Sequence, residues 1–212
     1  MAESDGNLAR SERTALCALL EERGPLAPTL CEGWATSDLA AHLFIRENRP
    51  WYGAGILIKP LAGLTERGMS EAKRRLGYGG LVDRVRSGPP GPLKALDGQV
   101  NLVEFYVHHE DVRRAGPEPA SPRSEPALQA ALWQQLKRSA WLLARRLRTA
   151  GLVLEAPGYG SVTARRSTPQ VTMTGAPGEL LLYLYGRRDV AEVELDGPEE
   201  GLRAVRETSF GL

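Results

Sequence analysis

The sequence is poor in cysteine and lacks the spacing that cysteine-based sites require. Its 212 residues contain two cysteines, Cys17 and Cys31, and they form no CxxC pair. This excludes the dense disulfide framework of a small secreted protein. We therefore expect free thiols in a reducing compartment, with Cys17 in the core of a helical stretch. Cys31 should lie in a loop before Trp34, as either a buried or a reactive thiol.

Long apolar runs and an excess of one charge sign are also missing. No apolar run approaches the roughly 20 residues that cross a bilayer, and residues 1–10 are polar rather than the start of a secretory leader. The 27 basic and 26 acidic residues leave a formal net charge of +1, so the protein has no overall electrostatic attraction to polyanions. We expect a cytoplasmic protein that binds neither membranes nor nucleic acid.

The first 150 residues show the spacing of amphipathic helices. Apolar residues recur every three or four positions, and glycine or proline interrupts the pattern where helices should end. Long helices with few strands are typical of an up-and-down four-helix bundle with one long crossover. The expected helices cover residues 11–23, 36 or 37 to 49, 98–115 and 127–147, with shorter pieces at 70–76 and 80–86.

Near Gly151 the hydrophobic period changes from 3.6 to about 2, which indicates short strands. The fold class that follows is α+β, with a helical bundle over residues 1–150 and a small C-terminal α+β domain over residues 151–212. The expected strands of the second domain cover residues 152–156, 161–164, 170–174 and 191–195, and its helices cover 178–186 and 199–207.

The three histidines fall in two short segments and suggest a metal site. Glu104 and His108 are four residues apart in an expected helix, so their side chains lie on the same face and can reach one point. His42 lies on the second turn of the helix that Thr36 or Ser37 should cap. Two imidazoles and one carboxylate with a free coordination position form the ligand set of catalytic zinc and also of non-haem iron.

The alternative for Glu104 and His108 is a surface pair that contributes a few tenths of a kcal/mol. Glu104 lies, however, on a stripe with Val103 and Val107. That stripe should be buried, and burial of an unpaired carboxylate costs several kcal/mol. Glu104 therefore requires a cation or a hydrogen-bond partner.

Residues beside the expected ligands have more than one reading. His109 is about 100° around the helix from His108, so we expect it to be structural or to line the pocket. Asp111 is one turn beyond His108, where it could orient the imidazole or pair with Arg114.

Two charged residues, Arg46 and Glu47, lie about one turn beyond His42. They could reach the mouth of the site. Exposure to solvent is the more common outcome for charged residues on a helix.

Two segments resemble a known family. The segment GWATSDLAAHL at residues 33–43, followed by a later helix with Glu104 and His108, resembles the DinB-like metal-binding bundles. It resembles in particular the actinobacterial mycothiol-dependent maleylpyruvate isomerase family. The segment TGAPGELLLYLYGR at residues 174–187 is similar to the small C-terminal domain of that family.

The resemblance implies a zinc ion held by His42, Glu104 and His108, and mycothiol, a small thiol, as cosubstrate. The segment HHEDVRR at residues 108–114 looks more like a subgroup that is described only as metal-binding. Arg187, at the end of an expected helix, could bind the thiol, although a cation there is also favourable for the helix itself.

We therefore expect a divalent-metal-binding protein, with zinc as the first choice, that acts as an isomerase or a thiol S-transferase. A thiol on the metal would lose its proton near neutral pH and attack an electrophilic small molecule. The alternatives are a non-enzymatic metal- or ligand-binding module and a non-haem iron enzyme with the same ligands. No residue is assigned a catalytic role, and the protein should be a monomer or a homodimer.

Overall fold

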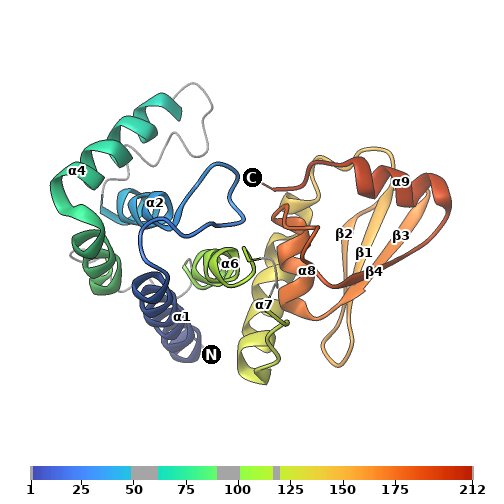
Figure 1. Cartoon of the computed structure of the whole chain (residues 1–212). Helices are drawn as coiled ribbons and strands as arrows, with labels where there is room; N and C mark the ends of the chain where they lie inside the picture. The colour runs from blue at the N-terminus through green and yellow to red at the C-terminus, as the bar shows by residue number, and fades with distance from the viewer. Residues whose placement is uncertain (1, 49–61, 90–100, 117–119, 212) are drawn as a thin grey trace. The chain divides into compact units, whose positions relative to one another are not determined.

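The computed structural model describes residues 2–48, 62–89, 101–116 and 120–211 (Figure 1). Seven helices and one four-stranded sheet occur in these residues, which confirms the α+β class. By its internal contacts the chain divides into two compact units, residues 1–120 and 121–212.

Helices form the described part of the first unit. Helix α1 contacts α2, α4 and α6, and α2 also packs along α4. Apolar side chains on the inner faces of all four helices are fully buried, among them Leu16, Leu43, Leu81 and Phe105. The helices are α1 (Ala2–Arg23), α2 (Thr36–Asn48), α4 (Ala62–Ser87) and α6 (Leu102–Arg113).

The N-terminus of α2 differs from the expectation that Thr36 or Ser37 caps the helix. The side chain of Thr36 donates to the carbonyl of Gly24 instead of capping the helix. The carboxylate of Asp38 accepts from the backbone N–H of Ala35, which is half of a capping box. The acid in the first turn therefore stabilises the N-terminus of α2 and sets the position of His42 one turn later.

Helix α4 consists of two pieces. Gly77 interrupts it with φ 65° and ψ 174°, a conformation that glycine adopts at little cost. The two expected helical pieces at 70–76 and 80–86 lie on either side of this break. Helix α1 begins well before the expected residue 11, and the expected beginning of α6 at 98–100 lies outside the described residues.

The second unit contains the sheet and three helices. The strand order is β2-β1-β3-β4, with β1 and β3 parallel and the two outer pairs antiparallel. The expected strands and helices are all present to within a few residues. They are α7 (Pro126–Leu143), β1 (Gly151–Ala156), β2 (Gly160–Arg165), β3 (Gln170–Gly175), α8 (Pro177–Leu184), β4 (Val193–Asp196) and α9 (Glu199–Glu207).

The register of the sheet follows the period of two in the sequence. Leu152 is opposite Val171, and Leu154 is opposite Met173. All four side chains are fully buried. Alternate residues of each strand thus face the core of this unit, as the pattern predicts.

The contacts group α7 with the sheet, although the sequence division at residue 150 assigned this helix to the bundle. The expected division into residues 1–150 and 151–212 stays a prediction about folding units.

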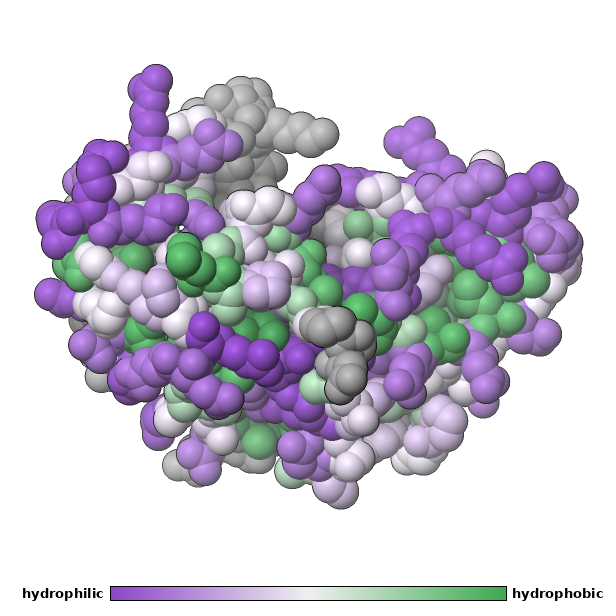
Figure 2. Space-filling view, viewed as in Figure 1, coloured by the Kyte–Doolittle hydropathy of each residue, from purple (hydrophilic) through white to green (hydrophobic). Residues whose placement is uncertain are grey.

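Hydrophilic residues dominate the face in Figure 2, with hydrophobic residues in small groups between them. Among the described residues no helix is long and apolar enough to span a membrane.

Candidate metal centre

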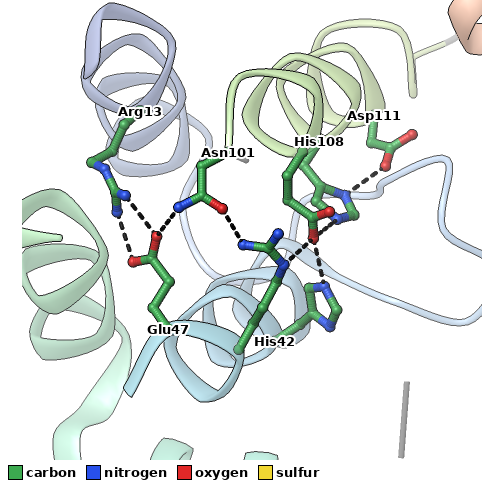
Figure 3. Close-up of polar contacts among 8 residues, drawn as sticks. Arg13, His42, Glu47, Asn101, His108 and Asp111 are labelled. Carbon is green, nitrogen blue, oxygen red and sulfur yellow. Dashed lines mark hydrogen bonds and ion pairs between the residues drawn. The ribbon is translucent and has the colours of Figure 1, made fainter. Parts of the chain in front are cut away.

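Helices α2 and α6 bring together the three residues expected to bind a metal. His42 comes from α2 and His108 from α6, as Figure 3 shows. Glu104 lies one turn before His108 on α6. The Nε2 atoms of His42 and His108 each lie 3.3 Å from Oε1 of Glu104. One donor atom from each residue lies within 4.8 Å of the other two.

Packing fixes both imidazoles. The side chains of His42 and His108 are buried, and their rings meet edge to face at 5.2 Å between centroids. Trp34, which precedes α2, lies with its ring centroid 5.1 Å from that of His42. Glu104 keeps 22% of its side chain exposed, more than either histidine does.

The two distances to Glu104 can be compared with those around a tetrahedral ion. Bonds of about 2.0–2.1 Å to nitrogen and oxygen place neighbouring ligands of zinc about 3.3 Å apart. The two observed distances to Glu104 have this value. Two imidazole nitrogens in a set of three donors suit a divalent ion that accepts nitrogen ligands better than calcium or magnesium, which prefer oxygen ligands.

The three side chains differ in protonation. Burial opposes ionisation of Glu104, but hydrogen bonds from His108 and His42 and the charge of Arg46 outweigh it and hold the pKa of this carboxyl well below its usual range. Burial lowers the pKa of His42. Burial also acts against a charged His108, yet its hydrogen bonds to Asp111, Cys31 and Glu104 raise its pKa well above the usual value.

Asp111 orients His108, one of the two readings of this residue. Its Oδ2 atom lies 2.9 Å from Nδ1 of His108, and the carboxylate is fully buried. When Nδ1–H donates to Asp111, the lone pair of the neutral imidazole is on Nε2, which faces Glu104. The thiol of Cys31 donates to the same Oδ2 atom at 3.2 Å.

A chain of polar contacts extends from Glu104 to α1 (Figure 3). Arg46 contacts Oε1 of Glu104 through Nε at 3.3 Å and donates to Asn101 at 2.5 Å. Asn101 donates to Glu47 at 3.4 Å. Glu47 in turn accepts two hydrogen bonds from the guanidinium of Arg13, at 2.6 and 2.7 Å.

The contacts of Glu47 differ from the expectation that it is exposed. Those of His109 distinguish it from His108. Glu47 is buried rather than exposed on its helix, because Arg13 supplies a paired charge. Nδ1 of His109 lies 3.2 Å from Glu12 of α1, which fits the structural reading of this residue. Arg114 donates to Glu110 at 2.5 Å, and Asp111 contacts His108.

Arg187, the residue expected to bind the thiol, lies in the second unit. Its guanidinium donates to the carbonyl of Tyr185 at 2.6 Å, which fits the structural reading of a cation near a helix C-terminus. A cavity of about 320 Å³ in this unit is lined by Tyr183, Arg188 and Arg206 together with four other described residues, and Arg187 is not among them. A thiol-binding role of Arg187 stays a prediction.

Sequence reasoning missed Arg13 and Asn101, and it gave Cys31 no place in the site. Arg13 lies in a helical segment in which nothing distinguishes it from exposed arginines. Cys31 carried one usable signal, because it closely precedes the segment with His42.

No protein-family model matches the chain, and no curated protein matches its sequence significantly. Two crystal structures are similar in fold. One is the mycothiol-dependent maleylpyruvate isomerase, with a TM-score of 0.60 and 16% identity over 92% of this chain and 93% of the other. The second is a histidine-to-alanine mutant of that isomerase, with a TM-score of 0.61, 16% identity and the same coverage. At this identity the likeness shows a distant structural relationship.

Proposed function

We propose that His42, Glu104 and His108 hold one divalent ion, with zinc as the first choice, and that the site activates a small thiol. The observation that carries the proposal is the convergence of two imidazole Nε2 atoms on one carboxylate oxygen at 3.3 Å each. An ion held here would have three protein ligands, and four-coordinate zinc would keep one position for a small ligand. Such open sites are typical of catalytic rather than structural zinc.

The side chains around the ligands support this role. With Nδ1–H of His108 donating to Asp111, the lone pair on Nε2 would be available to bind the ion. Arg46 and the two histidines keep Glu104 ionised. A bound ion supplies Lewis acidity, which lowers the pKa of a thiol at the free position and makes it a nucleophile at neutral pH.

The fold relationship directs the choice of thiol. The similar crystal structures are of an isomerase that depends on mycothiol. We infer that the cosubstrate is mycothiol or a similar small thiol and that the substrate is an electrophilic small molecule. Isomerisation and S-transfer share the attack by the thiolate, so either activity fits. A DinB-like four-helix bundle over residues 1–150, and thiol contacts of Arg187, belong to the same proposal.

The test is a titration of the cobalt-substituted protein with mycothiol. The Cys31→Ser background is used, so that only added thiol can place sulfur near the ion. Cys17 is fully buried elsewhere in the core. A thiolate-to-cobalt absorption band should appear as thiol is added, and the additional change His108→Ala should abolish it. If saturating thiol leaves the spectrum unchanged while other small ligands alter it, thiol activation is wrong and a metal-binding module is favoured.

The metal content of protein purified without added metals tests the iron alternative. Zinc at about one ion per chain supports the proposal. Iron together with oxygen-dependent spectral changes would assign the same three ligands to a non-haem iron enzyme.

A further inference from the structure

A second set of donor atoms lies on the opposite edge of the His108 ring. One donor atom each from His108, Asp111 and Cys31 lies within 4.8 Å of the other two. Asp111 Oδ2 is 2.9 Å from Nδ1 of His108 and 3.2 Å from Sγ of Cys31. If Asp111 only orients His108, its contact with the imidazole is explained. The contact of the Cys31 thiol with the same oxygen is not.

The loop that carries Cys31 is fixed to α6. The backbone N–H of Leu30 donates to the carbonyl of Asp111 at 3.0 Å. Inside the loop the hydroxyl of Thr29 donates to the carbonyl of Trp34 at 2.8 Å, and it accepts from the backbone N–H of Cys31 at 3.2 Å. The thiol therefore has a defined place beside Asp111, and Cys31 keeps partial solvent exposure through which an ion can enter.

We propose that Cys31, His108 and Asp111 form a second position for a thiophilic divalent ion, as an alternative to the position between His42, Glu104 and His108. Zinc bonds of about 2.3 Å to sulfur and 2.0 Å to oxygen or nitrogen place tetrahedral neighbours about 3.3–3.5 Å apart. The two contacts of Asp111 Oδ2, at 2.9 Å to nitrogen and 3.2 Å to sulfur, are close to this spacing, and all three donor atoms lie within 4.8 Å of one another. Sulfur, imidazole and carboxylate together favour zinc, cobalt or cadmium over magnesium or calcium.

The shared ring makes the two positions exclusive. A neutral imidazole has one lone pair, on either Nε2 or Nδ1. An ion between His42 and Glu104 needs that lone pair on Nε2, and Asp111 then accepts from Nδ1–H. An ion beside Cys31 needs it on Nδ1, and Glu104 then accepts from Nε2–H. The thiol proton of Cys31 passes to solvent when sulfur binds the ion.

The test uses cobalt alone, in buffer without thiols. His42→Ala disables the first position, and Glu104→Gln does so by a second route in case His42→Ala fails to fold. Both variants should bind about one cobalt per chain with a thiolate-to-cobalt band. Adding Cys31→Ser to either variant should remove the band. Cys17→Ala is the matched thiol control and should keep it, since burial raises the pKa of Cys17 to about 11 and places its sulfur in the core.

Three results would overturn the second position or its exclusivity. Absence of the band from both His42→Ala and Glu104→Gln at saturating cobalt rules out sulfur ligation, as does a band that survives Cys31→Ser. Two cobalt ions per wild-type chain would contradict the shared lone pair. The single variant Cys31→Ser separates this proposal from the previous one. If it binds no cobalt, the first position fails and the second stands.

Discussion

Buried polar groups are distributed unequally between the two units. Among the described residues with almost no exposed surface, twelve polar or charged side chains lie in residues 1–120, and two, Gln129 and Glu179, lie in residues 121–212. The core of the second unit consists mainly of apolar side chains packed on a regular sheet. The first unit buries charged side chains, and burial of a charge is costly unless a partner compensates it. The proposed metal site belongs to this unit.

The largest expected effect on stability comes from Arg13→Ala. Arg13 holds both carboxylate oxygens of Glu47 and contacts the ring of Phe105 at 4.2 Å. Its loss leaves a buried carboxylate without its cation, which should lower the free energy of unfolding by about 3–5 kcal/mol. Urea denaturation measures this change. Arg86→Ala removes a more exposed ion pair with Glu21 and should cost no more than about 1 kcal/mol. Equal losses in the two variants would show that burial of charge in the first unit is unimportant.

His108→Ala should have the largest effect on metal binding, because both proposed positions use this ring. Loss of an orienting partner of a ligand typically reduces affinity about 10–100-fold, so loss of the ligand itself should exceed about 100-fold. Competition with a chromophoric chelator gives the affinity. His109→Ala is the neighbouring control and should retain zinc, since His109 contacts Glu12 on another face of α6. A similar loss in both variants would contradict the ligand assignment.

Gln129→Met tests the contribution of a buried polar side chain in the second unit, where the group that is lost is uncharged. Gln129 donates to the carbonyl of Arg123 at 2.8 Å and accepts from the N–H of Gly178 at 2.9 Å. The substitution leaves both backbone groups without this partner at nearly constant side-chain volume, at a cost of about 1–3 kcal/mol. Thermal unfolding should therefore show a smaller loss than for Arg13→Ala. If Gln129→Met lost more stability than Arg13→Ala, the second unit would depend more on its buried polar group than the first unit does.

Zinc affinity should depend on pH through His108. Its raised pKa means that the metal-free site holds a proton that the ion must displace. Below this pKa the affinity should fall by about tenfold per pH unit, as for release of one proton. The stability that a charged His108 contributes to the metal-free protein has the opposite sign: it is present at low pH and is lost as pH rises through the folded pKa. Calorimetry in buffers of different ionisation enthalpy counts the protons released, and a count of zero would contradict a charged His108.

Local patterns predicted much of the fold. The change of period near Gly151 correctly marked the first strand, and the glycine-rich middle correctly suggested two helical pieces, now seen on either side of Gly77. The burial of Glu47 could not be predicted from the sequence. Its partner Arg13 is 34 residues away, and an exposed glutamate on a helix has the same local surroundings in the sequence.

The sequence by itself determined the features that depend on one turn of helix or one pleat of strand. The pairing of Glu104 with His108 is of this kind, because a separation of four residues places both side chains on one face. Only the tertiary structure decided which distant groups join them. His42 meets Glu104 across 62 residues and Cys31 meets Asp111 across 80, because α2 and the loop before it are held against α6. Such contacts depend on helix packing, which periodicity leaves open.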